Sequence, residues 1–184
     1  FLNFREELSD YRIKIPDPYR AAKYIYCIRH SFNKMIHTPF SKNRDMNKKW
    51  EDEITYSRKF LAGATIENLD FEELFTKYPP QEGDFWYLDP PYFIATDKGD
   101  YYRNNFSNSD HIRLKSHIDM INDAGAKFML SYDYRPEVEK LYNKYYIKTL
   151  DLKYSGATKE HRDKKRKEYL ILNYKPKTQI NIFN

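Results

Sequence analysis

The chain has 184 residues, enough for one domain or for one domain with a small appendage, and its formal net charge of +5 is too mild to identify a partner. A single cysteine excludes an intrachain disulfide and argues against a Cys-based metal site, and the five histidines show no metal-ligand spacing. No apolar run approaches membrane-spanning length, so we expect a cytoplasmic protein without a metal or a membrane partner.

The N-terminal third is predicted to be helical. Asp17-Pro18 is a favourable helix start, apolar residues recur at helical spacing to about residue 36, and Pro39 then interrupts the pattern. A second amphipathic helix is predicted over residues 47–62. Residues 1–60 are therefore expected to form a small helical region.

From residue 61 onward, short apolar strands alternate with helices. This alternation predicts an α/β fold with a mostly parallel sheet, and the last two strands, joined by a loop alone, predict a C-terminal antiparallel hairpin. The predicted strands are 64–69 (ATIENL), 84–88 (DFWYL), 127–131 (KFMLS), 145–154 and 168–174, and the predicted helices are 71–78, 111–125 and 135–142.

The stretch DFWYLDPPYF, residues 84–93, ends an apolar strand with an acid, two prolines and a tyrosine. Ligands of such sheets bind at the carboxyl ends of the strands, where this motif is expected. Because the prolines fix φ and lack N–H groups, the loop is stiff and its carbonyls stay available as acceptors. Asp89 and the Pro90 carbonyl would accept two N–H bonds from an amino group on a flat heterocycle, while Tyr92 would stack on the ring. A structural loop that caps a strand explains an isolated motif equally well.

This motif and four further stretches, in the same order, resemble the Dam-type (DPPY) DNA adenine methyltransferases. The resemblance covers nearly the whole chain. It implies a Rossmann-like class I methyltransferase sheet in a catalytic portion, residues 61–184, and a helical target-recognition subdomain in residues 1–60. The four stretches are RHSFNKM (29–35), ATIENLDFEEL (64–74), KFMLSYD (127–133) and SGATKEHRDKKRKEYLILNYKP (155–176).

The resemblance implies transfer of a methyl group from S-adenosylmethionine to the exocyclic amino group of an adenine in double-stranded DNA. The catalytic residues are then Asp89, Pro90, Pro91 and Tyr92. Asp89 and Pro90 would hold the amino group, and Tyr92 would stack on the base, which must first leave the duplex. Positioning and electrostatics would supply most of the acceleration, without a metal.

The same resemblance makes Asp70 and Phe71, together with Asp89, candidates for binding the cofactor, with the first two at its adenine end. A helix cap followed by a core phenylalanine is an equally good explanation of Asp70 and Phe71. The two explanations do not exclude each other.

The RHSFNKM stretch is expected to lie near the DNA groove, with Arg29, Phe32, Asn33 and His37 as DNA-binding residues. Phe32 would insert into the duplex or stack beside the vacated base. Its alternative role is that of the last core residue of the first helix. Lys34 stands where the family has Gly, so the recognised DNA sequence is left open.

The densest positive charge lies in residues 159–167, where Arg162, Lys164, Lys165 and Arg166 are expected to contact DNA phosphates. A solvated loop is the more common explanation of such a cluster. Its place on the hairpin loop that borders the expected base pocket favours phosphate contact.

The family's FxGxG turn, and the strand whose acid binds the cofactor ribose, are missing: no G-x-G occurs among the five glycines. In the family's sheet, the first two strands would lie side by side between the strand formed by residues 64–69 and the strand formed by residues 84–88. Without them, residues 64–69 would have no neighbour and strand 84–88 would have an open edge. We therefore expect a missing N-terminal segment or a complementing chain.

Two other functions stay open. One is an inactive DNA-binding fragment or subunit that needs a partner carrying the cofactor half. The other is methyl transfer to RNA or to a protein glutamine, against which Asp89 argues because relatives of that kind usually carry Asn before PPY. The leading expectation is a cytoplasmic, nucleoid-associated enzyme in a restriction-modification or a solitary role.

Overall fold

A computed structural model describes residues 17–31, 50–92, 106–152 and 166–176. The chain divides into two compact units, Phe1–Thr65 and Ile66–Asn184, and each is described by itself. The assignment of residues 1–60 to target recognition and of residues 61–184 to catalysis remains a prediction.

The first unit contains two described helices, α2 (Pro18–His30) and α3 (Trp50–Phe60). The Asp17 carboxylate caps α2 by accepting the backbone N–H of Tyr19 at 2.9 Å, which confirms the predicted start. The helix ends at His30 rather than near residue 36, with Ser31 as its extended C-cap. One ion pair joins the helices, between Arg29 of α2 and Glu53 of α3.

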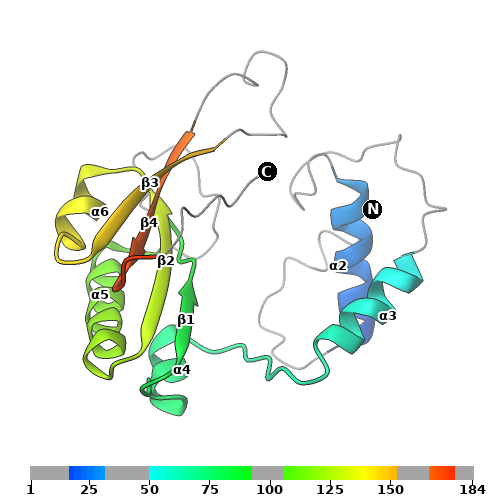
Figure 1. The fold of residues 1–184 in the computed structure, drawn as a ribbon. Helices are drawn as coiled ribbons and strands as arrows, with labels where there is room; N and C mark the ends of the chain where they lie inside the picture. The colour runs from blue at the N-terminus through cyan, green and yellow to red at the C-terminus, as the bar shows by residue number, and fades with distance from the viewer. Residues whose placement is uncertain (1–16, 32–49, 93–105, 153–165, 177–184) are drawn as a thin grey trace. The chain divides into compact units, whose positions relative to one another are not determined.

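The second unit is built around a four-stranded mixed sheet (Figure 1). The strand order is β1-β2-β4-β3; β1 and β2 are parallel, and β4 runs antiparallel to both β2 and β3. The predicted α/β fold and its C-terminal antiparallel hairpin are thereby confirmed, but the described sheet is mixed rather than mostly parallel, with one parallel and two antiparallel strand pairs. The elements are α4 (Phe71–Lys77), β1 (Phe85–Leu88), α5 (Asn108–Asp123), β2 (Lys127–Asp133), α6 (Pro136–Leu141), β3 (Tyr146–Leu152) and β4 (Arg166–Leu172).

The predicted strand at residues 64–69 is wrong. These residues have no regular structure, and Ile66 is 76% exposed. A strand requires a partner for its backbone groups, and in the described part of the sheet β1 pairs with β2 alone. The segment instead turns Glu67 toward α4, where its carboxylate accepts from Lys77 Nζ at 2.6 Å and Tyr78 Oη at 2.7 Å.

Helices α4, α5 and α6 cover one face of the sheet and form the core with it (Figure 1). Phe75 of α4 stacks on Trp86 of β1, with ring centroids 4.6 Å apart and planes 5° apart. Ile118 of α5 and Val138 of α6 are fully buried. Gly125, at φ +76°, lets the chain turn from α5 directly into β2.

The other face of the sheet carries the alternate residues of each strand. On β1 these are Phe85 and Tyr87, which are 57% and 61% exposed. Strand β1 is also an edge of the described sheet. Among the described residues, its second edge has no partner strand and lies beside two exposed aromatic rings. Among the described helices, none is long and apolar enough to cross a membrane.

Candidate active site at the carboxyl end of the sheet

Three strands bring polar side chains to one edge of the sheet. Strand β1 ends at Leu88 and is followed directly by Asp89. The parallel strand β2 ends in Ser131, Tyr132 and Asp133 at the same edge. Because β4 runs the opposite way, its first residues reach this edge too, and Glu168 stands directly opposite Asp133.

The Asp89 side chain is exposed but anchored. Ser131 Oγ of β2 donates a hydrogen bond to Asp89 Oδ1 at 2.8 Å. The same Oγ lies 3.5 Å from the Leu88 carbonyl and 3.4 Å from Tyr87 Oη. The carboxylate is thus tied to the neighbouring strand through one oxygen, which leaves Oδ2 for another donor.

The Tyr92 ring lies half-buried over Tyr132, with ring centroids 6.1 Å apart and planes 29° apart. Burial raises the pKa of the Tyr92 hydroxyl, and the nearby carboxylates of Glu168 and Asp89 raise it further. The Tyr92 hydroxyl is therefore neutral at physiological pH, and the ring is supported on one face by Tyr132.

The side chains that pack behind Tyr92 are buried and carry no charge. Tyr132 is fully buried and contacts Tyr142 of α6 at 5.8 Å between ring centroids. Its hydroxyl is hydrogen-bonded to Nδ1 of His111, a buried residue in the first turn of α5. Burial lowers the pKa of His111 to about 4, so the imidazole is neutral at physiological pH.

Pro90 and Pro91, which lie between Asp89 and Tyr92 in the sequence, are half-buried. Neither proline can donate from its backbone nitrogen, so this stretch offers a ligand only carbonyl acceptors. The four residues of the motif follow directly after β1, at the strand end where the sequence placed them. Their chemical roles remain predictions.

The two residues predicted for the cofactor's adenine end have structural roles of their own. Asp70 is the N-cap of α4 and forms a capping box with Glu73. Phe71 packs against the core, with the Arg113 guanidinium 4.9 Å from its ring centroid and Phe106 at 5.9 Å. Asp70 is nevertheless exposed, and carboxylate oxygens have lone pairs beyond those used by the cap.

The chemistry of these residues is compatible with S-adenosylmethionine, the methyl donor that the sequence predicted. Asp89 and Asp70 are exposed carboxylates, which can accept hydrogen bonds from hydroxyl and amino donors. The half-buried ring of Phe71 offers an apolar surface of the kind that an adenine ring contacts.

Most of the predicted DNA-binding residues lie outside the described residues: Phe32, Asn33, His37, Arg162, Lys164 and Lys165. Arg166 begins β4, so its backbone stands at the same edge of the sheet as Asp133 and Glu168. Arg29 is described, and its guanidinium forms the ion pair with Glu53. A phosphate contact by Arg29 would therefore compete with a carboxylate.

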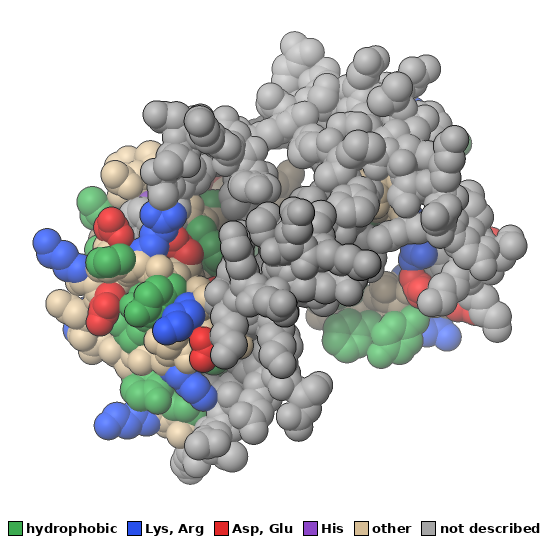
Figure 2. Space-filling model, turned by 90° about the horizontal axis from the view of Figure 1, so that it is seen from above, with side chains coloured by type: hydrophobic (Ala, Val, Ile, Leu, Met, Phe, Trp, Pro, Cys, Tyr) green, Lys and Arg blue, Asp and Glu red, His purple; other side chains and the backbone are tan. Residues whose placement is uncertain are grey.

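The described surface does not show a uniform charge. Figure 2 shows basic, acidic and hydrophobic side chains interspersed over the part of the second unit that is coloured. Across the described ranges, no three His, Cys, Asp or Glu side chains are grouped as metal ligands would be.

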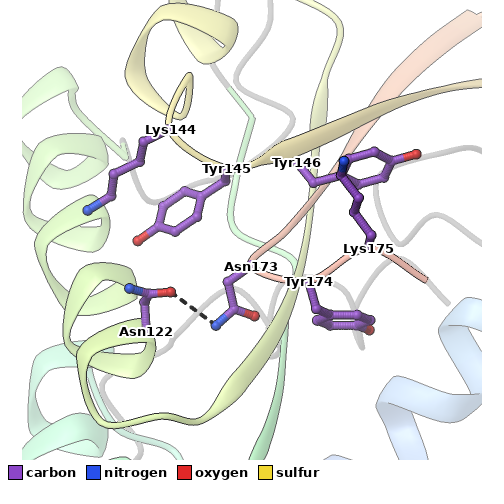
Figure 3. Close-up of a pocket in the computed structure, with 7 residues that line it drawn as sticks. All are labelled: Asn122, Lys144, Tyr145, Tyr146, Asn173, Tyr174 and Lys175. Atoms are coloured by element: carbon purple, nitrogen blue, oxygen red, sulfur yellow. Dashed lines mark hydrogen bonds between the residues drawn. The ribbon is translucent and has the colours of Figure 1, made fainter. Parts of the chain in front are cut away.

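A pocket of about 310 Å³ lies at the end of the sheet opposite to the Asp89 loop, where α5 ends, β3 begins and β4 ends (Figure 3). Several of its polar groups form contacts within the fold. Asn173 Nδ2 donates to the Ala126 carbonyl at 2.8 Å and to Asn122 Oδ1 at 3.3 Å, while Lys144 pairs with Asp119 at 2.9 Å. None of the residues predicted to be functional lies in this pocket.

Sequence reasoning missed three residues of the carboxyl edge: Ser131, Tyr132 and Glu168. A signal for two of them was present, since Ser131 and Glu168 are polar residues at the ends of otherwise apolar strands. Their convergence depends on the pairing of β2 with both β1 and β4. Tyr132 carried no such signal, because a buried tyrosine looks like any core aromatic.

The first described strand of this mixed α/β sheet ends in the Asp-Pro-Pro-Tyr loop, at the edge where α/β proteins bind their ligands. Residues 1–156 match the family described as D12 class N6 adenine-specific DNA methyltransferase. This match covers well over half of the chain, and the chain belongs to that family. The recognition made from the sequence is thereby confirmed.

Two curated relatives extend the comparison. The chain is 26% identical over 188 residues to a type II methyltransferase, M1.LlaDCHI, of Lactococcus lactis subsp. cremoris; the match covers 95% of this chain and 66% of the relative. It is also 26% identical over 205 residues to the modification methylase StsI of Streptococcus sanguinis, over 100% of this chain and 30% of the relative. The chain thus spans just under two thirds of the first relative and under a third of the second.

Proposed function

We propose that this protein transfers a methyl group from S-adenosylmethionine to the exocyclic N6 of an adenine turned out of double-stranded DNA. Membership of the adenine-specific family supports this proposal. The observation that carries it is the anchored pair of Asp89, held by Ser131 at 2.8 Å, and Tyr92, held over Tyr132. This pair offers a carboxylate acceptor and a flat ring on one stiff loop.

In the proposed mechanism the chain positions the amino group. Asp89 Oδ2 and the Pro90 carbonyl accept its two N–H bonds, so that the nitrogen lone pair points away from both acceptors. The half-buried face of Tyr92 stacks on the purine, as aromatic side chains do with extruded bases. Pro91 keeps the distance between the carboxylate and the ring constant.

The Asp89 carboxylate also stabilises charge. Positive charge would develop on N6 as the new N–C bond forms and the methyl–sulfur bond of the donor breaks, and a fixed negative group beside N6 would lower the barrier. N6 would then lose one proton to solvent. S-adenosylmethionine, when bound, supplies an electrophilic methyl group. We assign Asp70 and Phe71 to its adenine end, and we propose that Asp89 contacts both ligands.

The wider role follows from the relatives. One is named a type II methyltransferase and the other a modification methylase. We propose a restriction-modification role, with the protein in the cytoplasm at the nucleoid. The DNA contacts are assigned to Arg29, Phe32, Asn33 and His37 and to the basic residues Arg162, Lys164, Lys165 and Arg166.

A second candidate function is that of a subunit completed by a partner, and the edge position of β1 in the described sheet is the observation that raises it. Phe85 and Tyr87 are exposed there, and the strand has one partner in the described sheet. A partner chain or segment that adds strands at this edge would complete the sheet and could carry the site of the methyl donor. On this alternative the chain is a DNA-binding subunit without activity of its own.

The test uses the purified protein, labelled S-adenosylmethionine and an adenine-containing duplex. We expect methyl transfer by the wild type and its loss in Asp89→Ala, with DNA binding largely retained. Asp84→Ala, at the opposite end of β1, is the matched control and should stay active. Turnover retained in Asp89→Ala would refute the role of Asp89. Calorimetry that detects no S-adenosylmethionine binding at millimolar concentration would favour the subunit alternative.

A further inference from the structure

One hydroxyl of the neighbouring strand anchors the carboxylate of the candidate site. Ser131 Oγ donates to Asp89 Oδ1 at 2.8 Å. We propose that Ser131 is a positioning residue for methyl transfer, which fixes the Asp89 carboxylate at the end of β1. This inference rests on the proposed function, and it assigns a role to a residue outside the Asp-Pro-Pro-Tyr motif.

The sheet explains why the contact is possible. Leu88, the last residue of β1, pairs with Leu130 of the parallel strand β2. The next residue on each strand is therefore Asp89 and Ser131, side by side at the carboxyl edge. Leu130 is fully buried in the core, and alternation places the half-buried Ser131 on the opposite face of the sheet.

The protons of this network can be assigned from chemistry. An ionised carboxylate only accepts hydrogen bonds, and a serine hydroxyl has one proton to donate. The short distance places that proton on the bond to Asp89 rather than on the Leu88 carbonyl, which is 3.5 Å away. The Tyr92 hydroxyl keeps its own proton and can donate it to Glu168.

This assignment has a consequence for the substrate. With Oδ1 held by Ser131, rotation of the carboxylate is restricted and Oδ2 is the oxygen that remains for an amino group. Charge-assisted bonds of this kind are short and directional. Loss of the Ser131 hydroxyl would free the carboxylate to rotate, which disturbs the reacting geometry more than it disturbs binding.

The size of the effect follows from the sensitivity of group transfer to position. In Ser131→Ala we expect the single-turnover rate to fall about 10- to 100-fold, since misplacement by an ångström has effects of that order. The KM for DNA and the binding of S-adenosylmethionine should change little. Ser131→Thr, which retains the hydroxyl, should restore most of the rate.

Tyr87→Phe is the matched control. Tyr87 Oη lies 3.4 Å from Ser131 Oγ, but no hydrogen bond joins Tyr87 to Asp89 among the described residues. Its removal should leave the rate near the wild-type value. If the single-turnover rate falls equally in Ser131→Ala and Tyr87→Phe, or if Ser131→Thr does not restore it, the positioning role is overturned in favour of local packing. A Ser131→Ala rate equal to the wild-type rate would also overturn it.

A second measurement does not depend on turnover. High-resolution crystal structures of the wild type and of Ser131→Ala should show one Asp89 rotamer in the wild type and several in the variant. A single unchanged rotamer in the variant would contradict the inference. If the wild type transfers no methyl group while this difference in rotamers is found, the proposed function fails and the positioning of Asp89 by Ser131 stands.

Discussion

Tyr92 and Tyr132 lie with their ring centroids 6.1 Å apart, although one belongs to the loop after β1 and the other to β2. The contact gives Tyr92 a fixed aromatic support on one side. Because Tyr132 is itself buried and bonded to His111, the support is part of the core. The ring that is proposed to stack on the base is therefore supported by a side chain of the core.

The aromatic face of Tyr92, rather than its hydroxyl, is predicted to matter for turnover. Tyr92→Phe should retain kcat/KM within a few-fold, whereas Tyr92→Ala should lose about 1–3 kcal/mol of stabilisation, the usual contribution of one base stack. Steady-state methylation of a duplex by the two variants measures this difference. Equal losses of kcat/KM in Tyr92→Phe and Tyr92→Ala would show that the Tyr92 hydroxyl, rather than the ring, carries the effect.

Removal of the Phe75 ring should destabilise the second unit. Phe75 is 4% exposed and stacks on Trp86, so Phe75→Ala is expected to lower the free energy of unfolding by about 3–5 kcal/mol. Urea denaturation measures this change. Phe85→Ala, on the exposed face of the adjoining strand, is the control and should change the free energy by less than about 1 kcal/mol. A large loss in Phe85→Ala would mean that its face is covered in solution.

The stability of the fold should depend on pH through His111. Burial lowers its pKa from 6.5 to about 4 in the folded state, so the unfolded chain binds the proton more readily between these values. The contribution of neutral His111 is present above pH 6.5 and is lost as the pH falls toward 4. We expect about 1–3 kcal/mol of such loss, from the usual conversion of a pKa difference to free energy.

Urea denaturation at pH 7, 5.5 and 4 tests this dependence, with His111→Gln as the comparison. The variant should lose the part of the pH dependence that falls between pH 6.5 and 4. Asp110 acts in a lower window, because hydrogen bonds from Ser107 lower its pKa to about 2 and its contribution is lost only below pH 4. Identical pH profiles for wild type and His111→Gln would contradict the assignment.

The elements that the sequence predicted well are those whose signals are local. Asp70 with Glu73, and Gly125 after the fifth helix, mark ends that depend only on neighbouring residues, and both are observed. The motif from Asp89 to Tyr92 was placed correctly at a strand end because periodicity and prolines define that point. Such signals require no knowledge of what lies across the sheet.

The errors and omissions concern contacts between distant segments. Residues 64–69 have a strand-like composition, but a strand forms only where another strand accepts its hydrogen bonds, and none does so in the described sheet. Ser131 and Glu168 reach Asp89 and Tyr92 only through the strand order β1-β2-β4. No spacing along the chain encodes that order, so these two residues could not be assigned to the site from the sequence.

The central claim is that the anchored Asp89 directs methyl transfer to N6 of adenine in DNA. Mass spectrometry of nucleosides released from a randomised duplex, after incubation with the protein and S-adenosylmethionine, tests it most directly. We predict N6-methyl-2′-deoxyadenosine from the wild type and none from Asp89→Ala. Methylated cytosine in its place, or equal N6-methyladenine from both proteins, would contradict the claim.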